Sequence, residues 1–232
     1  MQFVFNAAPI YSLEVAGTSA RFPVNRIFCV GRNYAAHARE MGKDPDREPP
    51  FFFMKPSNAA LPAGPIETSI PYPPETQNFQ HEIELVVAIG KGGKNIGVDD
   101  ALEHVYGYAV GLDMTRRDLQ LEARDKGRPW EFGKSFAKSA PIGAVARVAD
   151  VGHLRQGAIS LKVNGAVRQA SDIAKLIWSV QESIAHLSRY ETLEPGDVIM
   201  TGTPEGVGAV LPGDVMEGAV AGLGSIVVRV ER

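Results

Sequence analysis

The chain has little cysteine, no long apolar run and no large excess of either charge. Its single cysteine, Cys29, excludes an internal disulfide and a cysteine-rich zinc site. Cys29 lies in the apolar run 27–30, which indicates a buried side chain rather than a catalytic thiol. No stretch approaches the roughly 18 consecutive apolar residues of a membrane-spanning helix, so we expect no transmembrane segment.

The charge balance and the first residues exclude two further classes. The chain carries 24 Lys and Arg against 27 Asp and Glu, and its formal net charge of −3 argues against a general nucleic-acid binder. Residues 1–20 contain no Lys or Arg and include Glu14, which is not the pattern of a signal peptide. We therefore expect a cytoplasmic protein that binds neither nucleic acid nor a membrane.

The composition that is present indicates a globular α+β protein. Hydrophobic residues make up 44% of the 232 residues and charged residues 22%, which are ordinary globular values. The chain has 24 glycines and 16 prolines, which favours strands joined by many turns over a helix bundle. Because no linker divides the chain, we expect a short strand and turn segment at 1–25 and one domain at 26–232.

Hydrophobic patterns predict more strand than helix. Strands are predicted at 26–30, 51–54, 81–90, 105–113, 198–200 and 225–230, and a hairpin is predicted at 159–169 around Asn164-Gly165. Helices are predicted at 34–41, at 115–126 with Thr115 as N-cap, and at 172–190, where apolar residues recur at helical spacing. Residues 43–50 are predicted to form a loop, and the prolines of 61–78 predict irregular structure.

Three acids are candidate metal ligands. Glu82 and Glu84 are two apart in a predicted strand, so their side chains share one face beside apolar neighbours. Two buried anions need a cation, and Asp113 at the end of the next strand supplies a third carboxylate. Oxygen ligands favour Mg²⁺, Mn²⁺ or Ca²⁺ over Zn²⁺. The alternative is that Glu82 and Glu84 lie on the solvent face of an edge strand.

Three further features are candidates for proton transfer or anion binding. His37 and Glu40 share a helix face, and a carboxylate beside an imidazole is what a general base needs; a surface pair is the alternative. Lys134, among aromatics and glycine, could stabilise an oxyanion or a carboxylate, unless it is an ordinary surface lysine. The glycine-rich segment 201–208 could present backbone N–H groups to an anion, and it matches neither a Walker A loop nor a Rossmann fingerprint.

Taken together, these segments resemble the fumarylacetoacetate hydrolase family. The matching segments are 30–34 with His37 and Glu40, 55–56, 81–85, 111–113 with 117–120, 127–134 and 201–208. The resemblance implies a strand-rich, mixed β-sandwich roll of the type of that family's C-terminal domain, in a protein that forms a homodimer. The family pattern has an Asp where Ala137 stands and often a Thr where Asn58 stands, and these departures bear on the substrate more than on the chemistry.

The resemblance also implies the roles of the site residues. It places Mg²⁺ or Mn²⁺, with Ca²⁺ as a substitute in crystals, on Glu82, Glu84 and Asp113, and it makes His37, Glu40 and Lys134 catalytic. It assigns substrate contacts to Arg32, Lys55, Gln120 and Thr203. The implied activity is hydrolysis of a C–C bond in 2,4-diketo acids such as fumarylpyruvate. Two alternatives are a decarboxylase or tautomerase of keto acids such as oxaloacetate, and a non-catalytic protein on the same scaffold.

Overall fold

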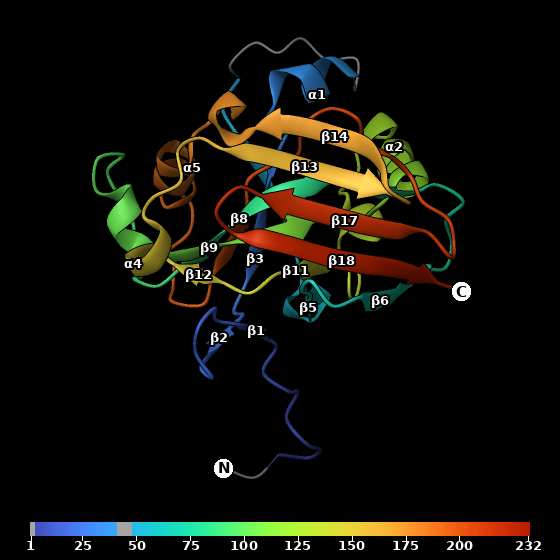
Figure 1. The fold of residues 1–232 in the computed structure, drawn as a ribbon. Coiled ribbons are helices and arrows are strands. Elements are labelled where there is room, and N and C mark those ends of the chain that lie inside the picture. Colours follow the sequence, from blue (N-terminus) through green and yellow to red (C-terminus); the bar gives the residue numbers. More distant parts are fainter. Residues whose placement is uncertain (1–2, 41–47) are drawn as a thin grey trace.

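The computed structural model describes residues 3–40 and 48–232, and two large sheets dominate the described part (Figure 1). The eight-stranded sheet has the order β4 (Phe51–Lys55), β3 (Ile27–Gly31), β15 (Val198–Met200), β8 (Ile83–Ile89), β9 (Val105–Leu112), β11 (Ala140–Ile142) and β5 (Ala60–Pro62), with β12 (Ala146–Arg147) paired to β9. The five-stranded sheet has the order β14 (Ala166–Asp172), β13 (Ala158–Val163), β17 (Val215–Val220), β18 (Gly224–Glu231) and β6 (Thr68–Pro71). The fold is therefore strand-rich and mixed, as predicted.

Smaller elements complete the chain. Two short sheets pair β1 (Ser12–Glu14) with β2 (Arg21–Pro23), and β7 (Phe79–His81) with β10 (Thr115–Arg116) and β16 (Gly208–Ala209). The α-helices are α1 (Ala35–Glu40), α2 (Arg117–Asp125), α3 (Glu131–Lys134), α4 (Val148–Val151) and α5 (Val180–Leu187). The 3₁₀ turns are η1 (Ser57–Ala59), η2 (Ala101–His104) and η3 (Ile173–Lys175). No helix in the described ranges is long and apolar enough to cross a bilayer.

The main core lies between the two large sheets. In Figure 1 the strands β13, β14, β17 and β18 lie across β8 and β9, and aliphatic side chains from both layers form one cluster. All seven residues of β8 are buried, because a second cluster around Leu13, Phe22 and Val86 covers the other face of the eight-stranded sheet. Each fully buried aliphatic side chain contributes roughly 1.5–3 kcal/mol, so β8 and β9 form a rigid frame.

The predicted helix at 172–190 was wrong. Residues 173–175 form the 3₁₀ turn η3, Leu176 makes a β-bridge with Tyr34, and helix α5 begins only after Ser179. Ser179 and Glu182 form a reciprocal capping box, which starts a new helix there. The helical spacing of apolar residues in 172–190 therefore combines residues of η3 and of α5, which are separate elements that both contribute to the core.

Other boundaries also differ from the sequence prediction. Residues 61–78 are not irregular throughout, since β5 and β6 pair in parallel with β11 and β18 and tolerate prolines at their ends. Helix α2 starts at Arg117 instead of Thr115, because Thr115 and Arg116 pair with β7. The predicted strand 81–90 is interrupted at Glu82, which lies between β7 and β8. Residues 41–47, which include most of a predicted loop, lie outside the described residues.

Candidate active site

The pairing of β8 with β9 brings the three predicted acids together. Ile83 faces Leu112 across this antiparallel pair, and the Asp113 amide donates to the Glu82 carbonyl at 2.8 Å. Glu82 and Asp113 therefore leave neighbouring strands at the same end, and Glu84 follows two positions along β8. One carboxylate oxygen from each residue lies within 4.8 Å of the other two, and all three side chains are buried. The alternative of a solvent-exposed edge strand is thus excluded.

Three buried cations surround this cluster of acids. Lys134 donates to Glu82 Oε2 at 2.8 Å and to Asp113 Oδ2 at 2.7 Å. Arg117 pairs with the other oxygen of Glu82. Lys55 Nζ lies 2.8 Å from Asp113 Oδ1, beneath the cluster. Glu82 and Asp113 thus each have two cationic partners, whereas Glu84 has no ion-pair partner among the described residues and accepts from the Gly202 amide at 2.7 Å.

These surroundings shift the pKa values of Glu82 and Glu84 in opposite directions. Burial disfavours the charged form of Glu82, but Lys134, Arg117 and His37 outweigh it and lower the pKa of this carboxyl. Burial, together with Asp113 and Glu82, raises the pKa of Glu84 well above its ordinary value. Burial alone would lower the pKa of Lys134, but Asp113 and Glu82 raise it, so this amine stays charged. Glu84 is therefore the acid that most needs a further positive charge.

The residues present fit a hard divalent cation. Each acid offers an oxygen donor, and the chemistry of three carboxylates suits Mg²⁺, Mn²⁺ or Ca²⁺. Asp113 Oδ1 is buried and accepts no hydrogen bond of good geometry, so it retains a lone pair for a ligand bond. The raised pKa of Glu84 is what a nearby divalent ion would reverse.

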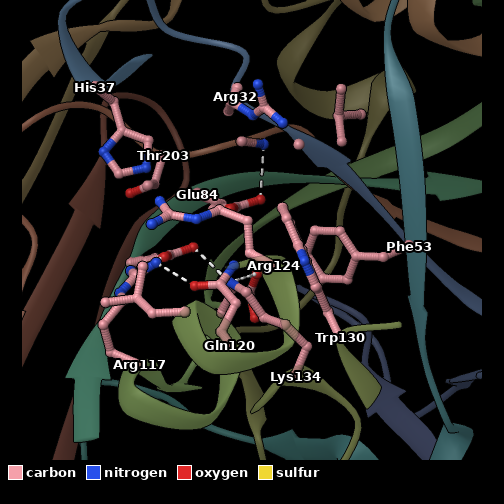
Figure 2. A pocket seen from close by; sticks show the side chains of 16 residues that line it. Arg32, His37, Phe53, Glu84, Arg117, Gln120, Arg124, Trp130, Lys134 and Thr203 are labelled. Atoms are coloured by element: carbon pink, nitrogen blue, oxygen red, sulfur yellow. Dashed lines mark hydrogen bonds and ion pairs between the residues drawn. The ribbon is translucent and has the colours of Figure 1, made fainter. Parts of the chain in front are cut away.

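The pocket opens above this cluster, as Figure 2 shows. His37 and Thr203 lie on one side of Glu84, and Arg117, Gln120 and Lys134 lie on the other. Further lining residues are Val30, Gly31, Arg32, Phe53, Leu121, Arg124, Trp130 and Gly202. The pocket thus has a charged floor and a partly aromatic wall, which suits a small anion with an unsaturated or apolar end.

His37 is buried on α1 and faces this pocket. Its predicted partner Glu40 ends the same helix, but the side chain of Glu40 lies outside the described residues. Helix α1 follows β3 after a short turn in which Arg32 adopts a φ of 54°, and both Arg32 and His37 line the pocket. This turn places the imidazole above the acids instead of on the surface.

The predicted substrate-contact residues fall into two groups. Gln120, Thr203 and Arg32 line the pocket, and Gln120 Oε1 accepts from Arg117 at 2.5 Å. Lys55 does not line it. Its amine donates to Met114 O, Ser139 Oγ and Lys134 O and lies close to Asp113. All three N–H groups of Lys55 are therefore engaged within the protein. The structure thus places Lys55 under the site, where the sequence interpretation expected a substrate contact.

Sequence reasoning missed several residues that line the pocket. Arg117 was noted in a matching segment without a role, yet it contacts both Glu82 and Gln120. Its spacing of three from Gln120 on a predicted helix was a usable signal, because such residues share a face. Trp130 and Arg124 carried no comparable signal, since their positions depend on how α2 and α3 pack.

Comparisons with known proteins agree with this arrangement. The model of the fumarylacetoacetate (FAA) hydrolase C-terminal family matches residues 26–231. A fumarylpyruvate hydrolase from Ralstonia sp is 50% identical over 188 residues, covering 80% of this chain and 96% of the relative. The human mitochondrial oxaloacetate tautomerase FAHD1 is 42% identical over 206 residues, covering 89% of this chain and 91% of the relative.

A solved structure is more similar still. The crystal structure of fumarylpyruvate hydrolase from Pseudomonas aeruginosa in complex with Mn²⁺ and pyruvate superposes with a TM-score of 0.98. It is 57% identical, and the match covers 99% of each chain. On the family match, these identities and the shared fold, the chain belongs to the fumarylacetoacetate hydrolase family.

Proposed function

We propose that this protein is a divalent-metal-dependent hydrolase that cleaves a C–C bond in 2,4-diketo acids such as fumarylpyruvate and releases pyruvate. The observation that carries this proposal is the convergence of three buried carboxylates beside Lys134 and below His37. Relatives that are 50–57% identical are fumarylpyruvate hydrolases, and one of them was crystallised with Mn²⁺ and pyruvate. Both the site and the relatives therefore support the same reaction.

Glu82, Glu84 and Asp113 are the proposed ligands, and Mg²⁺ is the proposed ion, with Mn²⁺ as its equivalent. When bound, such an ion acts as a Lewis acid toward the carboxylate and 2-keto oxygens of the substrate. Its two positive charges complement a dicarboxylate substrate, because the three acids are already balanced in number by Lys55, Lys134 and Arg117.

His37 is the proposed general base. It takes a proton from a water molecule, and the resulting hydroxide attacks the C4 carbonyl carbon of the substrate. Glu40 is proposed to accept the other ring N–H of His37 and thereby to set its tautomer. His37 is buried and lines the pocket, which supports its placement beside a bound substrate.

Lys134 and Gln120 are proposed to stabilise the departing pyruvate enolate. Lys134 uses two of its three N–H groups on Glu82 and Asp113, which leaves one for a substrate oxygen. Arg117 holds the Gln120 carbonyl, so the Gln120 amino group remains for the substrate. Fixed donors of this kind are effective because they need no reorientation as charge develops.

Arg32 and Thr203 are proposed to bind the two ends of the substrate. Thr203 lies beside the acids, and its backbone is suited to the keto-acid end. The Arg32 guanidinium lies over the Phe51 ring at 4.9 Å and makes no ion pair with any residue that the structure describes. Its charge is thus available for a carboxylate at the acyl end of the substrate.

Metal removal and a His37→Ala variant test this proposal together. We expect chelation to abolish loss of the diketo-acid absorbance and added Mg²⁺ to restore it. We expect His37→Ala to lower kcat by about 10²–10⁴ while its Mn²⁺ affinity stays within about twofold of the wild type, because His37 is not a ligand. Activity that survives chelation, or a large loss of Mn²⁺ affinity in His37→Ala, would contradict the assignment.

A second candidate activity is tautomerisation or decarboxylation of oxaloacetate. The human relative is an oxaloacetate tautomerase, and an enolate-stabilising site would serve that reaction as well. The two reactions differ in whether water is consumed. Turnover of fumarylpyruvate in ¹⁸O-water should place label in the released fumarate, whereas enol–keto exchange of oxaloacetate releases no new acid.

A homodimer is the proposed assembly. Apolar side chains of the N-terminal arm, including Phe3, Val4, Phe5 and Ile10, are exposed in the single chain, and a second copy would cover them. In Figure 1 this arm extends away from the two sheets. Light scattering should give about twice the chain mass of 25.0 kDa. A mass equal to one chain would contradict the proposal.

A further inference from the structure

The pocket segment 201–204 is held between two fully buried amide side chains. On one side, Asn33 donates to the Thr201 carbonyl at 2.8 Å. On the other side, Gln169 donates to Thr203 Oγ1 at 2.9 Å and to the Pro204 carbonyl at 2.8 Å. Both amides are 0% exposed, so each of these contacts is made without competition from water.

Gln169 is an unusual residue for its position. It lies on β14, where its neighbours Arg168 and Ala170 are exposed. Its oxygen accepts from the Ile83 amide at 3.1 Å and contacts His81 Nδ1 at 3.0 Å, while its amino group serves the 201–204 segment. Every hydrogen-bonding position of this amide is thus used, and the backbone partners fix which end carries the oxygen.

Two glycines, one in this segment and one two residues beyond it, bring the chain close to its neighbours. A Cβ atom on Gly202 would lie 2.7 Å from Asn33 Cβ, and one on Gly206 would lie 2.0 Å from the Arg168 carbonyl oxygen. Both glycines have a φ near +90°, at 98° and 89°, which few other residues adopt. The chain therefore packs closely against Asn33 at Gly202 and against β14, beside Gln169, at Gly206.

The held segment contacts the proposed metal ligands directly. The Gly202 amide donates to Glu84 Oε2 at 2.7 Å, and Thr203 Oγ1 donates to the Ile83 carbonyl at 2.8 Å. Both Gly202 and Thr203 line the pocket. A shift of this segment would thus move the hydrogen bond that orients Glu84, the acid without a cationic partner among the described residues.

We propose that Gln169 is a positioning residue for the metal site. Through Thr203 and Pro204 it fixes the segment whose Gly202 amide orients Glu84. The five-stranded sheet supplies no described residue to the pocket lining, so Gln169 is its link to the chemistry. This proposal rests on the metal site proposed above. Replacing an outer partner of this kind typically weakens metal binding about 10–100-fold.

The test compares Mn²⁺ binding to metal-free Gln169→Met and Leu161→Ala, followed by the spin-resonance signal of free Mn²⁺. Met fills the space of Gln169 without its hydrogen bonds. Leu161 is fully buried and is the register partner of Gln169 on β13, so Leu161→Ala weakens the same hairpin without touching the 201–204 segment. We expect Gln169→Met to bind Mn²⁺ at least tenfold more weakly, and Leu161→Ala to stay within twofold of the wild type.

A second variant covers the case in which Gln169→Met does not fold. Gln169→Asn keeps the amide but is one methylene shorter, so it cannot reach both the Ile83 amide and Thr203, and it should show the same loss of affinity. Mn²⁺ affinity within twofold of the wild type in a folded Gln169 variant would overturn the positioning role, as would an equal loss in Leu161→Ala. Failure of the wild type itself to bind Mn²⁺ would instead overturn the metal site.

Discussion

The two large sheets differ in the kind of side chain that they bury. The eight-stranded sheet and its ends carry Glu82, Glu84, Asp113 and Lys55 in buried positions. Among the described residues of the five-stranded sheet, the buried positions hold aliphatic residues, methionine and glycine, with Gln169 as the exception. One sheet therefore hosts the chemistry, while the other mainly contributes apolar packing. The predictions below test this division.

The largest expected effect comes from removing a paired acid of the eight-stranded sheet. Asp113→Asn leaves Lys55 and Lys134 buried with reduced compensation, so we expect it to lower the free energy of unfolding of the metal-free protein by about 3–5 kcal/mol. Urea unfolding in the presence of chelator measures this.

The matched control is Glu84→Gln. Because burial and the neighbouring acids raise the pKa of Glu84, they favour its neutral form, and Gln imitates that form. We expect its free energy of unfolding to change by less than about 1 kcal/mol, although both variants lose metal affinity. Equal destabilisation of the two variants would contradict the described charge pairing.

The next effect concerns Lys134. Lys134→Met removes the proposed donor for the developing enolate, and we expect kcat at saturating Mn²⁺ to fall about 10²–10³-fold. Because the same change removes a positive charge beside Glu82 and Asp113, Mn²⁺ should bind at least as tightly as in the wild type. Activity that returns when more metal is added would show that Lys134 acts on metal binding instead.

The smallest effect lies at the start of α2, the helix that carries Arg117 and Gln120. Asp118 accepts from Thr76 Oγ1 at 2.6 Å and from the Gln77 amide at 2.9 Å. We expect Asp118→Ala to lower the free energy of unfolding by about 1 kcal/mol and to leave Mn²⁺ affinity unchanged. Urea titrations of both proteins, paired with Mn²⁺ binding, measure this.

The same variant has a defined pH dependence. Burial works against the charged form of Asp118, but its hydrogen bonds lower the net pKa below the ordinary value of 3.8. The stability that ionised Asp118 contributes is therefore fully present above the ordinary pKa of 3.8. It is lost as the pH falls through the lower pKa of the folded state. The stability difference between wild type and Asp118→Ala should shrink at acidic pH, and a difference that grows would contradict it.

The acids could be predicted because their signal is local. Glu82 and Glu84 share the period of a strand, Asp113 ends the next predicted strand, and the resemblance to the family assigned all three as ligands. Their convergence then follows from the register of β8 and β9, which places Glu82 beside Asp113. The fold class and the strands at the core were predictable for the same reason, since apolar runs mark them directly.

Other features depend on contacts between distant segments and left no local signal. A glutamine in a predicted hairpin strand is commonly a solvent-facing residue, and nothing near Gln169 in the sequence indicates that it reaches Thr203. The helix prediction at 172–190 failed because Leu176 does not lie on a helix face. It pairs with Tyr34 in an isolated β-bridge instead. Such positions are decided by tertiary packing, which a single sequence does not contain.

The pairing of the buried charges has a consequence for how the enzyme is assembled. Glu82 and Asp113 already face Lys134, Arg117 and Lys55, and Glu84 is neutral when its carboxyl is protonated. We therefore expect the metal-free chain to fold completely and to acquire its ion afterwards. Protein made without divalent ions should therefore be folded but inactive, and addition of the ion alone should activate it.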